Sequence, residues 1–303
     1  MKPRLVSRLT NEYLLRVLDQ LRAGFDGDIV KGMIFLAVTQ SNVGHIDHDP
    51  GLAKSWSDVD TPPPDHLRRP VSAGAIASLL GLPKETARRK IRQMVEDRYC
   101  ALAPGGVIVP RRVFLRPGNV DALVRHAADL RGFYAALAEH DIGATRDYAL
   151  APGQARLRQL GRFSAEYILC AVDGMKALFG GELLSGLIFM AITAANVRHI
   201  TDAPGDLYAE LDTPPPDTER RPISAMALSR ELGIPAETVR RHVRQLERDG
   251  YCVARREGLV TPNDVLMRAD FRQATAQSAA HVGWLLRQMA QVGVLTPRAL
   301  API

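Results

Sequence analysis

The chain has 303 residues, of which 46% are hydrophobic and 24% are charged, and its formal net charge is +6. This length predicts about two domains, and the composition is typical of a soluble globular protein. Three cysteines argue against a disulfide framework, and the most apolar stretches, near residues 29–38 and 183–192, are too short to span a membrane. With no apolar signal core at the N-terminus, we expect a cytoplasmic protein, and its basic charge favours an anionic partner.

The first half of the chain predicts a defined order of elements. An amphipathic helix and an almost wholly apolar helix come first, followed by a proline-rich loop. Two short helices joined by a glycine turn come next, and Ser72 is a suitable N-cap for the first of them. A two-stranded hairpin and a long amphipathic helix complete the series. The predicted helices cover residues 11–23, 28–44, 72–80, 84–97 and 119–139, the loop ends in Pro62–Pro64, and the hairpin covers residues 99–109.

The second half repeats this order. DTPPPDHLRRP at residues 60–70 and DTPPPDTERRP at 212–222 share nine of eleven positions. Residues 72–100 and 224–252 share 15 of 29 positions at the same offset of 152. An internal duplication is the simplest explanation. We therefore expect one domain over residues 9–140, a partly helical linker over 141–160 and a second domain over 161–303.

The strings SAGAIASLLGLPKETARRKIRQMVEDRYC and SAMALSRELGIPAETVRRHVRQLERDGYC resemble the DNA-binding part of bacterial transcription regulators of the MarR, GntR and Crp type. The resemblance covers about 40 residues of each copy. It implies a mainly α fold with small β-wings, in which two winged helix-turn-helix domains with flanking helices occur in tandem. It also implies a sequence-specific transcription regulator that uses two recognition helices from one chain.

The predicted DNA contacts follow from the geometry of such a module. A recognition helix places its N-terminal residues against base edges in the major groove, where arginine can read guanine and glutamate can read cytosine. Helix N-termini, preceding arginines and the wing tip would hold phosphates. For the arginines of the RRP segments, the alternative is pairing with Asp60, Asp65, Asp212 or Asp217. The predicted set is Arg68, Arg69, Ser72, Lys84, Glu85, Thr86, Arg88, Arg89, Arg92, Arg220, Arg221, Ser224, Glu237, Thr238, Arg240, Arg241, Arg244, Arg255 and Arg256.

A second repeated feature lies at the end of the apolar helix. Asn42 and His45 recur as Asn196 and His199, three residues apart and therefore on one helix face. One interpretation is that they hydrogen-bond the proline-rich loop, and the other is that they bind a small-molecule effector. We find no metal-ligand cluster, no cofactor motif and no nucleophile–base pair, so neither a metal, a cofactor nor an enzyme is predicted.

The expected partner is double-stranded DNA, bound at a bipartite site. If the copies were related by a two-fold axis, this site would be an imperfect inverted repeat with half-sites about one DNA turn apart. A homodimer and a small-molecule effector are further expectations, whereas a membrane is not. The protein would then be associated with the nucleoid. Two alternatives stay open: a replication-initiator or architectural DNA-binding protein, and a winged-helix scaffold that binds other proteins.

Overall fold

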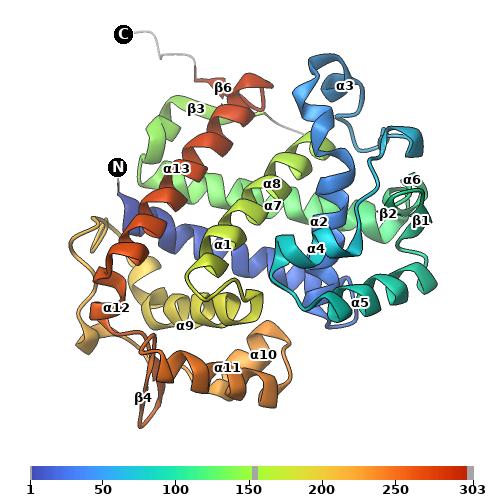
Figure 1. The fold of residues 1–303 in the computed structure, drawn as a ribbon. Helices are drawn as coiled ribbons and strands as arrows, with labels where there is room; N and C mark the ends of the chain where they lie inside the picture. The colour runs from blue at the N-terminus through green and yellow to red at the C-terminus, as the bar shows by residue number, and fades with distance from the viewer. Residues whose placement is uncertain (1, 152–155, 299–303) are drawn as a thin grey trace, which may run out of the picture. The chain divides into compact units, whose positions relative to one another are not determined.

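The computed structural model describes residues 2–151 and 156–298. The described chain is mainly helical with small two-stranded sheets, which confirms the predicted fold class at this level (Figure 1). The first copy contains α1 (Pro3–Ala23), α2 (Ile29–Val43), α3 (Pro50–Ser55), α4 (Ala73–Leu80), α5 (Lys84–Glu96), β1 (Ala101–Ala103), β2 (Gly106–Ile108), α6 (Arg111–Phe114) and α7 (Pro117–Glu139). The 3₁₀ helices Gly44–His48, Asp65–Leu67 and Ile142–Asp147 lie between or after them.

The second copy repeats these elements except α3, whereas strands β3, in the predicted linker, and β6 have no counterpart among the described residues of the first copy. It contains β3 (Tyr148–Leu150), α8 (Leu157–Ala177), α9 (Leu183–Thr201), the 3₁₀ helix Asp217–Glu219, α10 (Ala225–Leu232), α11 (Ala236–Arg248), β4 (Val253–Arg255), β5 (Gly258–Val260), α12 (Asn263–Met267), α13 (Ala269–Gln291) and β6 (Leu295–Pro297). The first and last long helices of the two copies have equal lengths: α1 and α8 each have 21 residues, and α7 and α13 each have 23, whereas α2 has 15 and α9 has 19. The duplication read from the sequence therefore extends to the flanking helices, where sequence identity is low.

Two elements differ from the sequence-based expectation. Helix α1 begins at Pro3 rather than near residue 11, because Leu5, Val6 and Leu9 are buried and extend its apolar face. Part of the predicted linker forms strand β3, which pairs antiparallel with β6 near the C-terminus. Residues 152–155 of that linker lie outside the described residues.

The chain folds into two compact units that do not follow the repeat boundaries. Unit 1 holds most of the second copy together with α1 of the first copy, and unit 2 holds most of the first copy together with the N-terminal part of α8. Each unit therefore takes the first helix, or part of it, from the other copy. Unit 1 comprises Met1–Met33, Leu80–Leu82 and Cys170–His281, and unit 2 comprises Ile34–Leu79, Pro83–Leu169 and Val282–Ile303.

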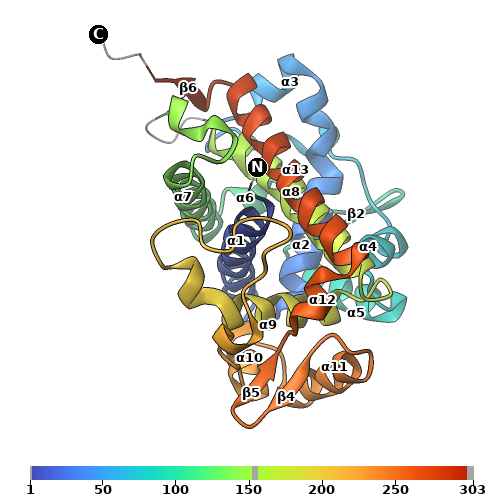
Figure 2. The same ribbon diagram turned by 90° about the vertical axis from the view of Figure 1, so that its left-hand side faces the viewer.

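Helix α9 forms the centre of unit 1. It contacts α1, α10, α11 and β5, and Figure 2 shows the β4–β5 hairpin beside α11 in the same unit. Among the described helices, α9 is the one long and apolar enough to cross a membrane, with a mean hydropathy of 1.4 over its most apolar window. Because 72% of that window is buried inside the protein, α9 is a core helix.

Unit 2 is built on the contact between α7 and the start of α8. The rings of Phe133 and Tyr167 stack with their centroids 6.2 Å apart, and His126 Nε2 lies 2.7 Å from Ser164 Oγ. The Tyr134 hydroxyl donates to the carbonyl oxygen of Thr145 at 2.8 Å, which fixes the segment after α7. This packing gives unit 2 a core of its own.

Two short helices followed by a hairpin occur twice, and we call each occurrence a helix–hairpin segment (residues 71–109 and 223–261). The second segment lies in unit 1, and the first lies in unit 2 except for Leu80–Leu82. In the first segment, Val71 forms a β-bridge to Val107. The hairpin turn approaches this bridge so closely that a Cβ on Gly106, at φ 157°, would lie 2.3 Å from the carbonyl oxygen of Val71. Gly258 occupies the equivalent position, at φ 144°, so the same turn requires glycine twice.

Candidate functional site

Helix α11 in unit 1 has one buried face and one basic face. Val239, Val243 and Leu246 are buried. The exposed side chains include three arginines within the first three turns, Arg240, Arg241 and Arg244, and one acid, Glu237. The turn between α10 and α11 contains Gly233 at φ 63°. The apolar face fixes the helix on its unit, and the arginines face solvent.

Helix α5 in unit 2 has the same organisation. Its buried residues are Ala87, Ile91 and Met94. The exposed side chains are Lys84, Glu85, Arg88, Arg89 and Arg92, with Glu96 at the end of the helix, while Thr86 is half-buried like its equivalent Thr238 in α11.

Acids on these helices pair with some of the arginines. Arg88 Nη1 lies 2.6 Å from Glu85 Oε1, and Glu237 lies 3.5 Å from Arg240 and 3.6 Å from Arg244. Such exposed pairs contribute at most about 1 kcal/mol, so a ligand can displace them. Within the described part of the chain, Arg89 and Arg241 form no ion pair and are the more available cations.

Ser72 and Ser224 act as helix caps. The hydroxyl of each accepts a hydrogen bond of 3.1 Å from the backbone N–H three residues later, at Ala75 and Ala227. Both serines are exposed at the N-termini of α4 and α10. Each cap hydroxyl uses one N–H of its helix, and the sequence-based interpretation assigned the other N–H groups of the first turn to a phosphate.

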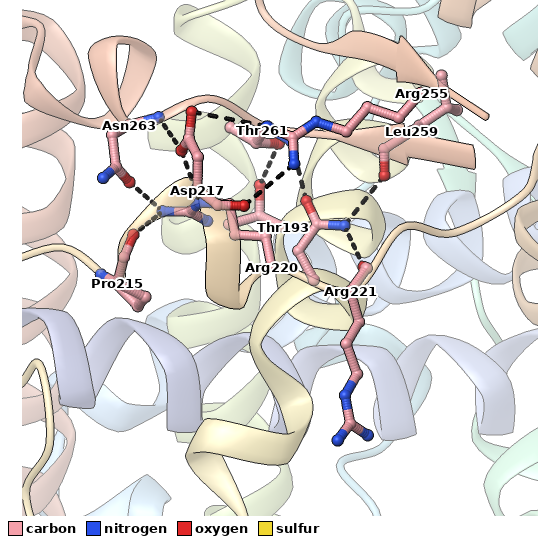
Figure 3. Close-up of polar contacts among 10 residues, drawn as sticks. Thr193, Pro215, Asp217, Arg220, Arg221, Arg255, Leu259, Thr261 and Asn263 are labelled. Atoms are coloured by element: carbon pink, nitrogen blue, oxygen red, sulfur yellow. Dashed lines mark hydrogen bonds and ion pairs between the residues drawn. The ribbon is translucent and has the colours of Figure 1, made fainter. Parts of the chain in front are cut away.

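The structure corrects the assignment of Arg68 and Arg220. Their side chains are 1% and 0% exposed, so neither can reach an external partner. Arg220 Nε donates to Asp217 at 3.3 Å, and its Nη2 donates to the carbonyl of Pro215 and the side chain of Asn263 (Figure 3). Arg68 makes the equivalent contacts with Asp65 and the carbonyl of Pro63. These two arginines fix the proline-rich loop. Pairing with an aspartate of that loop was the alternative to DNA contact in the sequence-based interpretation.

The next arginines of the RRP segments behave differently. Arg69 and Arg221 have exposed side chains, and Figure 3 shows the Arg221 guanidinium directed away from the loop contacts. Their backbones are held, since each N–H donates at 3.0 Å to the carbonyl of Asn42 or Asn196. Arg69 and Arg221 therefore remain in the predicted DNA-contacting set.

The two arginines of the second hairpin also differ from each other. Arg255 lies close to the proline-rich loop, with Nη1 donating to the backbone oxygen of Asp217 at 3.1 Å (Figure 3). Arg256, at the tip of the hairpin, is exposed. Arg256 is therefore the better placed of the two for an external phosphate.

The repeated asparagines hold the hairpins in place. Asn196 is fully buried; its Nδ2 donates to the carbonyls of Arg221 and Leu259, and its Oδ1 accepts from the backbone N–H of Thr261 at 2.9 Å. Asn42 makes the same three bonds in unit 2. With every polar atom of both amides used by the backbone, we no longer assign them to an effector.

His45 and His199 lie half-buried beside these asparagines. The Nδ1 atom of each is buried without a hydrogen-bond partner among the described residues. Burial lowers the pKa of His45 below its usual value, and Arg69 and His48 lower it further. No described group of three or more His, Cys, Asp or Glu side chains is arranged to hold a metal ion.

Sequence reasoning missed a set of buried arginines in the first helix of each copy. Arg4 and Arg8 of α1 recur as Arg158 and Arg162 of α8, at an offset of 154. All four are at most 9% exposed. Arg4 and Arg8 donate to backbone carbonyls in a loop of the second copy, and Arg158 and Arg162 donate to backbone carbonyls in a loop of the first copy. The repeated Arg-x-x-x-Arg spacing was the available signal, but low identity around it concealed the equivalence.

Comparison of the chain with protein-family models, with curated proteins and with solved structures gives no match. The function is therefore argued from the geometry of the site.

Proposed function

We propose that the protein is a sequence-specific regulator of transcription that binds double-stranded DNA through two tandem winged helix-turn-helix domains. The observation that carries the proposal is that each unit presents one amphipathic helix with a basic outer face, α5 in one and α11 in the other. Both helices follow a glycine turn and precede a hairpin, which is the element order of a winged helix.

The charge on these helices suits the major groove. A recognition helix in the groove reads base edges with its N-terminal turns, and arginine can contact guanine through two hydrogen bonds. Arg88 and Arg89 occupy these turns in α5, as Arg240 and Arg241 do in α11. Arg92 and Arg244 lie one turn further along, where a phosphate contact is expected.

The contacts beside the helices are proposed for phosphates. The N-termini of α4 and α10 offer backbone N–H groups, and Arg69 and Arg221 lie exposed just before them in the chain. Phosphate contacts supply much of the affinity and make it depend on salt. Arg68 and Arg220 are left out of this proposal because they are buried. A DNA-binding role would place the protein on the nucleoid.

The two domains are expected to prefer different sequences. Lys84 at the start of α5 is replaced by Ala236 in α11, and the uncharged tip of the first hairpin is replaced by Arg256 and Glu257 in the second. The first domain therefore offers Lys84 to the major groove, and the second offers Arg256 to the phosphate backbone of DNA. Non-identical half-sites are the expected consequence.

The decisive experiment selects binding sites from random duplex DNA with the purified full chain and then measures affinity at two salt concentrations. One enriched bipartite motif is expected, together with a steep loss of affinity at the higher salt concentration. The variants Arg89→Ala and Arg241→Ala should each weaken binding by about tenfold or more, since a bidentate base contact is worth about 1–3 kcal/mol. The variants Arg125→Ala and Arg287→Ala, which remove exposed arginines from α7 and α13, are charge-matched controls.

Three outcomes would contradict the proposal. The first is the absence of any enriched motif, and the second is an equal loss of affinity in the control variants. The third is an activity in the cell that survives alanine at Arg88, Arg89, Arg240 and Arg241, which would indicate a protein-binding scaffold. Enrichment of iterated identical repeats would instead favour a replication initiator.

A further inference from the structure

A buried arginine in unit 1 lacks partners for part of its guanidinium group. Arg8 lies in α1 with 9% of the residue exposed, and its Nη2 donates to the carbonyl of Leu207 at 2.7 Å. Its Nε and Nη1 are buried and have no hydrogen-bond partner among the described residues. Arg22, Arg68, Arg158 and Arg220 each leave one such nitrogen, whereas Arg8 leaves two. Buried charged donors are costly to leave unpaired, so Arg8 is the strongest candidate for binding a further partner.

The other copy shows which partner this position accepts. Arg162, the equivalent of Arg8, donates from Nε and Nη2 to the two carboxylate oxygens of Asp47 at 2.7 and 2.8 Å. Its Nη1 donates to the backbone carbonyl of Trp56, so the whole group is satisfied. At the offset of 154 that relates these helices, the residue equivalent to Asp47 is Thr201. Unit 1 therefore has the arginine but lacks the carboxylate.

The charges around Arg8 favour an anion. Arg4 and Arg220 are buried in the same region and line the same cavity. The nearby acids are already engaged, since Glu12 lies 3.3 Å from Arg198 and Asp206 lies 2.5 Å from Lys2. Burial lowers the pKa of Arg8 to about 10; Arg4 also lowers it and Asp206 raises it. Arg8 is therefore still charged at neutral pH.

The space beside Arg8 has a polar part and an apolar part. The polar part is a cavity of about 60 Å³ whose lining includes Arg4, Arg8, Thr201 and Arg220, together with Glu12, which is paired with Arg198. This volume is larger than the roughly 10–15 Å³ needed for one water molecule. A second cavity of about 120 Å³ shares Ser7, Asn11, Thr193, Leu266 and Thr275 with the first. Its apolar lining includes Leu14, Met175, Leu178, Phe189, Met190 and Phe271.

We propose that unit 1 binds a small organic acid, whose carboxylate pairs with Arg8 as Asp47 pairs with Arg162 and whose apolar part lies in the larger cavity. An inorganic anion would fill only the polar part of this site. This binding site does not depend on the proposed DNA-binding function, because the acid is expected to bind the protein in the absence of DNA. It differs from the effector site expected at the asparagine–histidine pairs, which hold the hairpins instead.

The first test measures binding by the full chain of acetate, hexanoate, benzoate and phenylacetate, using calorimetry and thermal unfolding. Benzamide and benzyl alcohol serve as uncharged analogues, and inorganic phosphate serves as an anion without an apolar part. Hexanoate, benzoate or phenylacetate should bind and raise Tm, while acetate, phosphate and the uncharged analogues should bind at least about tenfold more weakly. The expected ratio follows from the loss of a charge-assisted hydrogen bond or of the apolar contact.

Two variants then test the site without depending on each other. Arg8→Gln should weaken binding by at least about tenfold while its circular dichroism matches that of the unchanged protein. Thr201→Asp supplies the missing carboxylate, so it should abolish ligand binding and raise Tm in the absence of ligand. Thr201→Asn is the matched uncharged control, and it should do neither.

The proposal is overturned if none of the three larger acids binds, whatever the effect of Thr201→Asp on Tm. It is also overturned if Arg8→Gln binds them as tightly as the unchanged protein. Equal binding of phosphate and benzoate, both sensitive to Arg8→Gln, would indicate a simple anion site and would overturn the assignment to an organic acid.

Discussion

Arg162 in α8 and Asp47 in the 3₁₀ helix after α2 form a bidentate ion pair, although 115 residues separate them in the chain. Their side chains are 5% and 8% exposed. Breaking a buried pair leaves an uncompensated charge, so Asp47→Ala should lower the free energy of unfolding by about 3–5 kcal/mol. Urea denaturation measures this change. Asp121→Ala, at an exposed position in α7, should change it by less than about 0.5 kcal/mol, and an equal effect of both would refute the argument.

Adjacent arginines of the RRP segment should have separable effects. Arg220→Met removes a buried side chain that fixes the proline-rich loop, so it should cost about 2–4 kcal/mol of stability. Arg221→Met removes an exposed side chain and should change stability by less than about 0.5 kcal/mol. When both variants are measured under conditions in which they are fully folded, Arg221→Met should weaken DNA binding and Arg220→Met should not. The two measurements are chemical denaturation and a binding titration, and identical behaviour of the two variants would contradict this assignment.

The repeated asparagines should contribute to stability through the hairpins. Asn196→Leu removes three hydrogen bonds and leaves the N–H of Thr261 without its acceptor, which should cost about 3 kcal/mol. Hydrogen exchange should become faster at Thr261 in this variant, and Asn42→Leu should produce the same effect at Val109. Unchanged exchange at both amides would show that the hairpins are held by other contacts.

Stability should fall in mild acid because of His126 in unit 2. Burial lowers the pKa of His126 to about 4, below the ordinary value of 6.5 that it regains on unfolding. Between these values the unfolded chain binds a proton that the folded chain does not, so the free energy of unfolding decreases as pH falls from 6.5 towards 4. The loss amounts to about 3 kcal/mol once pH lies below the folded value.

The control for this prediction is His126→Gln, which keeps a polar group near Ser164 but does not titrate. Denaturation at several pH values should show a shallower pH dependence for this variant than for the unchanged protein. Parallel curves for the two proteins over pH 4–6.5 would exclude His126 as the cause.

The sequence by itself determined the duplication, the order of the helices and hairpins and the outward faces of α5 and α11. These features depend on local periodicity, on caps such as Ser72 and on turn glycines such as Gly233, which act within a few residues of their own position. An apolar repeat of 3.6 residues shows which face of a helix is buried. It therefore also shows that the arginines on the opposite face of α11 are exposed.

Only the tertiary structure decided which partners these elements take. The apolar face of α1 could pack on either copy, because both copies offer equivalent surfaces, and local periodicity does not distinguish them. Arg220 and Arg221 are neighbours with the same charge, yet one is buried and the other exposed. Arg220 has acceptors in its own loop, Pro215 and Asp217, but its third acceptor, Asn263, lies 43 residues away. Likewise, the lack of a carboxylate at the position equivalent to Asp47 depends on Thr201, which lies 193 residues from Arg8 in the sequence. Contacts of this kind arise from the closing of long loops, which no local pattern specifies.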